Sequence, residues 1–435
     1  MRLTFSNLYK HTQYLCKLSP NNYYLANVID ERLVIRRLQP PELEVLQVFE
    51  MRYPIDYIAW SPNSEYIAAV SLEKSCIDVR SVHDAAYKGT LKDEGFSLHR
   101  IRWSCDSNSI VCISKLKLRI AIWNLLTQDA KYMDHIKVDN KGIENSPDSR
   151  WTAVVQKIDG KDCISLYNAD FNYLFQSFEV DTVDLEDLKW SPSSMYIAAW
   201  DNCLYYKLLI YRVDGAICRI YEGDGPSSLG IKCVNWSPNN RFLAVGNYDG
   251  TVHLLSTDTW DLITKLKHPS SISAKLNIVN KLTLCSYSNF LDKYVQKRPY
   301  HLSIRRPDYN EPNPKIGIGG CYFSPDSYYL CTKNDSMPNA IWIWEVNTLT
   351  CLHLLIFKSN VRQMIWNPNE EHILVVICGD ENIHFVSLEK RSREIELNLI
   401  KAPTKDFLVK KACWSKNGES LLLMDQQLFC MASGQ

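Results

Sequence analysis

The chain has 435 residues, of which 46% are hydrophobic and 23% are charged, a composition that excludes an intrinsically disordered protein. Basic and acidic residues number 49 each, so the charge gives no general attraction to nucleic acid, and no apolar run is long enough to span a membrane. The 15 cysteines lack the CxxC spacing of zinc or redox sites, and the N-terminus lacks the apolar core of a secretion signal, so we expect free thiols in a reducing, cytosolic protein.

The first ten residues precede any repeated pattern. Within them, Thr4–Lys10 reads as a strand that has no partner in its own neighbourhood. A strand without a local partner is expected to pair with a distant segment, because an exposed sheet edge favours aggregation.

A unit of three short strands then recurs along the chain. Its clearest copy, NWSPNNRFLAVGNYDGTVHLL from Asn235 to Leu255, has a Ser-Pro-Asn turn after the first strand and an Asp-Gly hairpin before the third. The serine of this unit, or its equivalent, stands at Ser19, Ser61, Ser104, Ser146, Ser191, Ser237, Ser324, Asn367 and Ser415. Apart from one interval of 87, these positions lie 42 to 48 residues apart, close to the roughly 40–45 residues of a WD-repeat blade.

The repeats therefore predict an all-β fold in which residues 1–435 form a single closed WD-repeat β-propeller of about nine blades. An irregular or two-ring arrangement is the alternative. The last unit supplies only the strands Ala412–Ser415, Ser420–Met424 and Leu428–Met431. We expect the strand Thr4–Lys10 to complete this blade and so join the two ends of the chain.

The pattern lapses between residues 268 and 314, which explains the interval of 87 as one blade plus an insertion. The sequence leaves open whether this insertion is a projecting loop or a degenerate blade. It contains seven basic residues against three acidic ones. We expect five of the basic residues to help bind an acidic partner surface: Lys293, Lys297, Arg298, Arg305 and Arg306.

The tryptophans of the repeats have two different positions. The WD dipeptide is degenerate, with Trp123-Asn124 and Trp344-Glu345 as its nearest relatives, and no Gly-His pair accompanies it. This leaves the usual hydrogen bonds between His, Ser and Trp in doubt. At the end of the first strand, six blades carry a tryptophan that we expect to pack between blades: Trp60, Trp103, Trp190, Trp236, Trp366 and Trp414.

Motifs for chemistry are missing from the sequence. Gly225–Lys232 (GPSSLGIK) places Ile231 where a phosphate-binding loop needs Lys, and Gly317, Gly319 and Gly320 lead into a strand instead of a helix. The histidines show no metal spacing and no nucleophile motif. We therefore expect a protein without catalytic activity, cofactor or metal.

Three passages resemble a known family: DTVDLEDLKWSPSSMYIAAWDNCLYYKLLIYRVDG from Asp181, SLGIKCVNWSPNNRFLAVGNYDGTVHLL from Ser228, and NPKIGIGGCYFSPDSYYLCTKNDSMPNAIWIWE from Asn313. Together with the atypical WD dipeptides and the insertion, they are similar to the WRAP, or WD-repeat-eight, family of centrosomal and spindle-pole proteins. The resemblance covers essentially the whole chain.

The resemblance implies a scaffold at centrosomes, centriolar satellites or spindle poles that helps anchor microtubule minus ends and organise the mitotic spindle. It implies a coiled-coil microtubule-anchoring partner and a minus-end-directed kinesin. Two other classes stay open, a ribosome- or RNA-associated propeller of the translation-initiation type and a propeller hydrolase. Balanced charge counts against the first, and missing acid, base or metal motifs count against the second.

We expect the partner to contact residues at strand ends and turns within these three passages, because a propeller exposes its loops there. Trp200 could be either a buried anchor in the interface or part of the core. Turn acids such as Asp201, Asp249 and Asp335 more often bind backbone amides than a partner. The predicted contact residues are Trp200, Asp201, Asn313, Lys315, Asn334 and Asp335.

Overall fold

The computed structural model forms two compact units, Met1–Val180 with Ile400–Gln435 (unit 1) and Asp181–Leu399 (unit 2). It describes residues 3–39, 42–92, 95, 97–116, 119–137, 141–223, 229–272, 277–281, 299–308, 310, 315–370, 372–390 and 394–434, with residues 277–281 described by their backbone alone. No helix within these ranges is long and apolar enough to cross a membrane.

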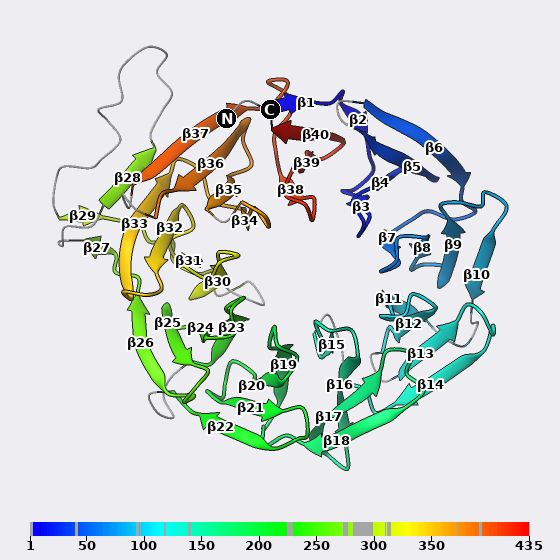
Figure 1. Ribbon diagram of the computed structural model, residues 1–435, viewed down its shortest axis with the longest axis horizontal. Coiled ribbons are helices and arrows are strands. Elements are labelled where there is room, and N and C mark those ends of the chain that lie inside the picture. The colour runs from blue at the N-terminus through cyan, green and yellow to red at the C-terminus, as the bar shows by residue number, and fades with distance from the viewer. Residues whose placement is uncertain are drawn as a thin grey trace. The chain divides into compact units, whose positions relative to one another are not determined.

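Nine antiparallel sheets, built on the same four-strand plan, run through the described ranges (Figure 1), so the prediction of an all-β, nine-bladed propeller is confirmed. Unit 1 contains β3 (Cys16–Leu18), β4 (Tyr24–Ile29), β5 (Arg32–Gln39) and β6 (Glu42–Glu50); β7 (Tyr57–Trp60), β8 (Tyr66–Ser71), β9 (Cys76–Ser81) and β10 (Lys88–Lys92); β11 (Leu98–Trp103), β12 (Ser109–Ser114), β13 (Arg119–Asn124) and β14 (Ala130–Asp134); β15 (Ile143–Asn145), β16 (Trp151–Ile158), β17 (Lys161–Asn168) and β18 (Leu174–Glu179); and β38 (Lys411–Trp414), β39 (Ser420–Met424) and β40 (Leu428–Gly434) with β1 (Leu3–Phe5) and β2 (Tyr9–Lys10). Unit 2 contains β19 (Leu185–Trp190), β20 (Tyr196–Asp201), β21 (Leu208–Arg212) and β22 (Ile217–Tyr221); β23 (Ile231–Trp236), β24 (Phe242–Asn247), β25 (Thr251–Ser256) and β26 (Leu262–Lys267); β30 (Ile318–Phe323), β31 (Tyr329–Asn334), β32 (Ala340–Glu345) and β33 (Thr350–Phe357); and β34 (Gln363–Trp366), β35 (Ile373–Ile377), β36 (Asn382–Leu388) and β37 (Ile395–Lys401), of which the last two residues belong to unit 1.

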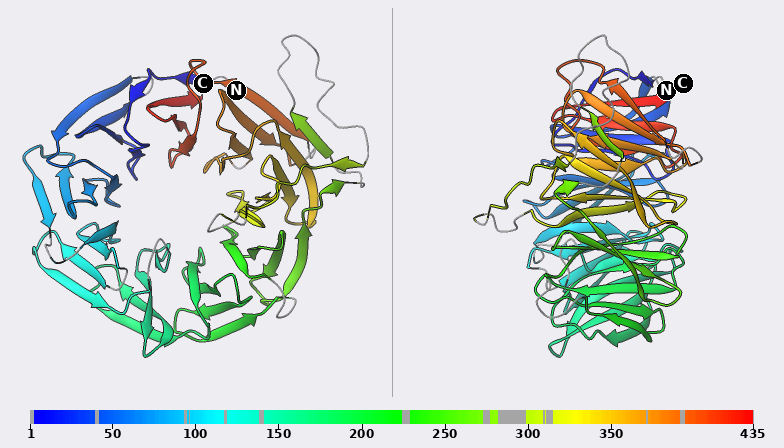
Figure 2. Two further views of the ribbon diagram at one scale, coloured as in Figure 1. Left: turned by 180° about the vertical axis from the view of Figure 1, so that it is seen from behind. Right: turned by 90° about the vertical axis from the view of Figure 1, so that its left-hand side faces the viewer.

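The two ends of the chain share one blade of unit 1, as predicted. β1 and β2 both pair antiparallel with β40, and Figure 2 shows the N-terminal strand beside the C-terminal ones. The predicted single strand is split in two. Between the two pieces, the Ser6 N–H donates to the Met431 carbonyl at 2.8 Å, while the Met431 N–H donates to Ser6 Oγ at 2.9 Å.

The Ser-Pro-Asn turn explains why the repeat folds as it does. In the copy at Ser237, the hydroxyl donates to Asn239 Oδ1 at 2.7 Å and accepts the N–H of Phe242 at 2.9 Å, which closes the turn between the first two strands. Asn240 then has a φ of 58°, in the left-handed region that asparagine tolerates well. In five cases the residue at this left-handed position accepts an N–H from a neighbouring blade: Asn21 to Ser64, Asn63 to Ser107, Ser193 to Asn240, Asn239 to Ser327 and Lys416 to Asn22.

The repeated tryptophan of the first strand packs between blades, as predicted. Five of the six are buried and Trp414 is half-buried. The indole N–H donates to a first-strand carbonyl of the preceding blade at 3.0–3.2 Å, from Trp60 to Lys17, Trp103 to Ala59, Trp236 to Lys189 and Trp366 to Tyr322. These four tryptophans fix the spacing between blades, because each of the four combines apolar packing with a directional bond.

One blade of unit 2 retains hydrogen bonds that link a histidine, a hydroxyl and a tryptophan, although its WD dipeptide is degenerate. His268 Nε2 lies 2.8 Å from Thr332 Oγ1, which also accepts the indole N–H of Trp344 at 2.8 Å. The other ring nitrogen of His268 lies 3.0 Å from the Gly250 carbonyl. The doubt about these hydrogen bonds is therefore unfounded for this blade. Here they join the connection after β26 to β31 and β32.

Burial of the His268 side chain predicts a pH-dependent stability. It lowers the pKa of His268 from 6.5 to about 4, so the unfolded chain binds a proton at a pH where the folded chain does not. Stability is therefore present above about pH 6.5 and is lost as the pH falls toward 4. We expect His268→Gln to reduce the loss of unfolding free energy between pH 7 and pH 5 by about 2 kcal/mol, measured by urea denaturation. Identical pH dependence in the two proteins would contradict this role.

The insertion at 268–314 is described only in part. β27 (Ser271–Ile272) pairs with β29 (Tyr300–His301), and β28 (Asn277–Lys281) pairs parallel with β33, at the outer edge of its blade. Leu302 is buried in the core of the same blade. The described parts are thus attached to β30–β33, and a projecting loop or a degenerate blade for the whole insertion stays a prediction.

Candidate functional site

The three passages that carry the family resemblance lie next to one another in unit 2. Their loops form a continuous surface across three consecutive blades, which we call the loop band. The loop band consists of residues 181–187 and 201–207, 229–232 and 247–250, and 315–319 and 333–336.

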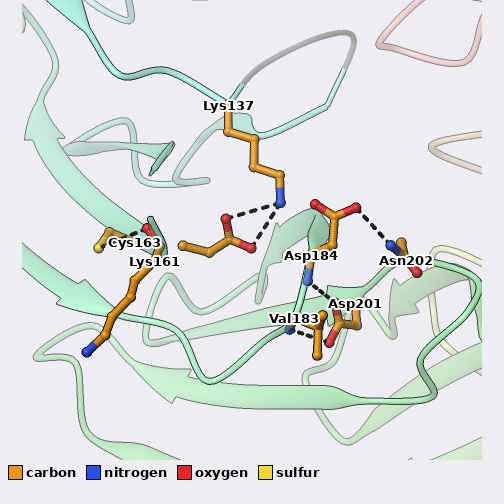
Figure 3. Close-up of polar contacts among 8 residues, drawn as sticks. Lys137, Lys161, Cys163, Val183, Asp184, Asp201 and Asn202 are labelled. Atoms are coloured by element: carbon orange, nitrogen blue, oxygen red, sulfur yellow. Dashed lines mark hydrogen bonds and ion pairs between the residues drawn. The ribbon is translucent and has the colours of Figure 1, made fainter. Parts of the chain in front are cut away.

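Asp201 fixes the first part of the loop band. Its carboxylate is fully buried and accepts the backbone N–H groups of Val183 at 2.9 Å and Asp184 at 2.7 Å (Figure 3). Next to it, the Asn202 side chain donates to the Asp184 carboxylate at 2.8 Å, and the Asn202 N–H donates to the Asp184 carbonyl. The connection that precedes β19 is therefore tied to the turn that follows β20. In unit 1, Lys137, which Figure 3 labels, forms a separate ion pair at 2.9 Å with the buried carboxylate of Asp162.

Two glycines bring the other parts of the loop band into contact. The Gly230 N–H donates to the Cys203 carbonyl at 2.9 Å, and a Cβ on Gly230 would lie 2.7 Å from the Cys203 Cα. Gly317 has a φ of 70°, and a Cβ there would lie 2.5 Å from the Tyr248 Cα. Any larger side chain would force the loops apart, so close backbone approach is the role of these glycines.

A charged group lies where residues 229–232 of the loop band meet residues 333–336. Lys232 Nζ lies 2.7 Å from the Asp335 carboxylate and donates to the Ile316 carbonyl at 2.5 Å. Lys333 Nζ lies 3.9 Å from the same carboxylate and donates to the Val361 carbonyl at 2.6 Å. Burial lowers the pKa of Lys333, and Asp335 opposes that change. These side chains are mostly buried, so the group joins β23 to the blade of β30–β33 and leaves little charge exposed.

Large apolar side chains are exposed on residues 181–187, 201–207 and 229–232 of the loop band. The exposed fractions are 74% for Leu204, 61% for Val183, 51% for Leu229 and 44% for Tyr205. Leu204 and Tyr205 belong to the turn held by Asn202, whose side chain accepts the Leu204 N–H at 2.9 Å and whose carbonyl accepts the Tyr205 N–H at 3.1 Å. The sequence did not single out these four residues, although the motif WDNCLYYK contains two of them.

The predicted contact residues occupy different environments. Trp200 is 4% exposed and packs in the core of unit 2. This favours a role in the core over the other role that the sequence allowed, an anchor in the interface. Asp201 and Asn334 are also buried, and the Asn334 side chain accepts the Ser336 N–H at 2.9 Å. Burial of these three side chains disfavours direct contact with a partner, and a role for them in partner contact stays a prediction.

The remaining predicted residues are still candidates for partner contact. Lys315 is exposed, whereas Asp335 is bound to Lys232. Arg305 and Arg306 are exposed on the insertion. The other four predicted residues lie outside the described residues: Asn313, Lys293, Lys297 and Arg298.

Potential metal ligands do not converge in the described ranges. No cluster of three or more His, Cys, Asp or Glu side chains that could hold a metal ion occurs there. The side chains of Cys112, Cys331 and Cys378 are buried, and burial raises the pKa of Cys378 to about 12. Such a thiol is a weak nucleophile at neutral pH. The loop band presents exposed apolar side chains on turns that hydrogen bonds hold in place, which are properties of a binding surface.

Comparisons with known proteins agree with this architecture. Residues 188–283 match the family described as the WD40 domain of anaphase-promoting complex subunit 4. The solved C-terminal WD40 domain of Sif2 superposes with a TM-score of 0.53 over 99% of this chain and 98% of its own, at 10% identity, which shows a shared fold. An uncharacterized WD repeat-containing protein of Schizosaccharomyces pombe is 24% identical over 79% of this chain and 72% of its own length. The mouse WD repeat-containing protein WRAP73 is 32% identical over 99% of this chain and 95% of its own length. The chain therefore belongs to the WRAP73 family of WD-repeat proteins.

Proposed function

We propose that this protein is a non-enzymatic scaffold at centrosomes, centriolar satellites or spindle poles, where it helps anchor microtubule minus ends and organise the mitotic spindle. The observation that carries the proposal is the similarity to mouse WRAP73 along nearly the whole of both chains, which includes every blade. Propellers of this type present rigid loop surfaces to other proteins. The loop band is a surface of that kind, because backbone bonds fix its turns.

The proposed partners are a coiled-coil microtubule-anchoring protein and a minus-end-directed kinesin. The test is the position of the full-length protein, tagged at its endogenous locus, in mitotic cells, followed by recovery of its partners from mitotic extract. We expect a signal at spindle poles and a coiled-coil protein among the partners. A diffuse signal together with sedimentation on ribosomes would overturn the proposal and favour the translation-initiation class.

We also propose that the insertion at 268–314 contributes to this function by attracting an acidic surface of the partner. Arg305 and Arg306 are exposed, and the Arg305 N–H donates to the Ser336 carbonyl of the loop band at 2.8 Å. Exposed charges act over about 8 Å at physiological salt, so they mainly raise the association rate.

We therefore expect replacement of five basic residues with Ser to lower partner recovery about threefold to tenfold at low salt and much less at high salt. These residues are Lys293, Lys297, Arg298, Arg305 and Arg306. The measurement is partner recovery across a salt series. Equal recovery by the two proteins at every salt concentration would exclude this role.

A further inference from the structure

We propose that the exposed apolar residues Val183, Leu204, Tyr205 and Leu229, together called the loop patch, bind one amphipathic helix of a partner whose apolar stripe is flanked by Lys and Arg. This inference rests on the proposed scaffold function and specifies the surface and the chemistry of the partner.

The loop patch is continuous because backbone bonds join its segments. Val183 is held by Asp201, and the Gly230 N–H bonded to Cys203 brings Leu229 beside the turn that carries Leu204 and Tyr205. All four side chains are exposed, and the backbone under them is fixed before any partner arrives. A rigid apolar surface loses little conformational entropy on binding, so its apolar area contributes efficiently to affinity. Clustered exposed apolar side chains of this kind mark interaction sites more often than single ones.

The surroundings of the loop patch are acidic. Apart from the buried Asp201, the segments 181–187 and 201–207 contain four carboxylates and one basic residue, Lys207. The Lys207 ammonium is already 2.7 Å from the Asp181 carboxylate, and Glu186 is exposed in the same segment as Val183. This balance favours a partner that carries positive charge next to its apolar residues.

The position of the loop patch selects a helix over an extended strand. Val183, Leu204, Tyr205 and Leu229 lie in connections between strands, and the backbone N–H groups of the first three are bonded within the protein. Contact must therefore come through side chains, whereas an added strand needs a free row of backbone donors and acceptors. A helix presents apolar side chains at positions i, i+3, i+4 and i+7 along one face, which suits a surface made of separate apolar side chains.

Leu126 supplies a matched control for Leu204. Leu126 is 73% exposed in a turn of unit 1, and its N–H donates to the side chain of Asn124 at 2.8 Å, as that of Leu204 does to Asn202. Replacement of either leucine with Asp adds one negative charge to an exposed turn of the same construction. The two variants are expected to have the same melting temperature as the wild type.

The first experiment uses photo-cross-linking to identify the occupant. The full-length chain with p-benzoylphenylalanine at position 204 is irradiated in mitotic extract, and the cross-linked partner peptide is sequenced; a chain with the probe at position 126 is the control. We expect a peptide from position 204 with apolar residues three or four apart and net positive charge. A second copy of this chain, an acidic peptide, a peptide without this spacing, or no product specific to position 204 would overturn the inference.

The second experiment measures affinity with a synthetic peptide of the cross-linked sequence. We expect Leu204→Asp to weaken binding about tenfold or more and Leu126→Asp to leave it unchanged, with weaker binding at higher salt. Equal affinities for the three proteins would overturn the inference. Localisation separates the two proposals: if the wild type and Leu204→Asp both reach spindle poles at equal levels, the loop patch is not the docking site, whereas a wild type absent from the poles refutes the scaffold function itself.

Discussion

Deletion of residues 1–10 is expected to destabilise unit 1 by about 3–6 kcal/mol, because it removes the outer strand of the blade β38–β40. The deleted segment pairs with β40 through β1 and β2, and Ser6 exchanges two hydrogen bonds with Met431. Its last carbonyl, on Lys10, accepts a hydrogen bond from the Asn27 side chain of the next blade at 3.1 Å. The change therefore weakens two blades at once.

Chemical denaturation of the full-length and shortened proteins measures this effect. Thr4→Val is the control, since it removes only the hydroxyl that lies 2.9 Å from Ser433 Oγ and keeps the strand, and it should cost about 1 kcal/mol or less. We also expect the shortened protein to aggregate, because β40 would expose an unpaired edge. A shortened protein as stable and as monomeric as the full-length one would show that the N-terminal strand does not support the last blade.

Asp201→Ala is expected to lower the free energy of unfolding by about 2–4 kcal/mol. The substitution leaves the N–H groups of Val183 and Asp184 without the buried carboxylate that accepts both of them. It should also loosen the connection that carries Val183, and so reduce partner binding indirectly. Thermal and urea unfolding measure the loss of stability.

Asp249→Ala is the matched control for Asp201→Ala. Asp249 is also a turn aspartate of unit 2, and its carboxylate accepts the Thr251 N–H at 2.8 Å, but it is exposed. Water can replace an exposed acceptor, so we expect a cost of about 1 kcal/mol or less. If both variants lose the same stability, burial of the Asp201 carboxylate is not what fixes the loop band.

The sequence predicts the fold well because its turn chemistry is repeated. Each Ser-Pro-Asn turn uses a local hydroxyl, a local side-chain acceptor and a local left-handed residue, all within six positions. Such signals need no knowledge of distant contacts. The N-terminal strand was predictable for a different reason, since the last unit lacked one strand and Thr4–Lys10 had no other partner.

Long-range partners explain what the sequence could not predict. His268 and Thr332 are bonded but lie 64 positions apart, because the insertion separates them, so the motif is not recognisable along the chain. Trp200 is the penultimate residue of β20, which is buried on both faces, so that alternation cannot separate core from surface. Leu204 and Tyr205 belong to the apolar run CLYYKLLIY, in which Tyr206 is buried. Sequence alone cannot tell which members of that run turn outward.

The most direct test of the proposed scaffold is the position of microtubule minus ends in mitotic cells whose endogenous copy is replaced by a chosen variant. We expect minus ends to be focused at the poles with the wild type and with Leu126→Asp. They should be scattered without the protein and with the deletion of residues 1–10. Minus ends that stay focused at the poles in cells lacking the protein would contradict an anchoring role.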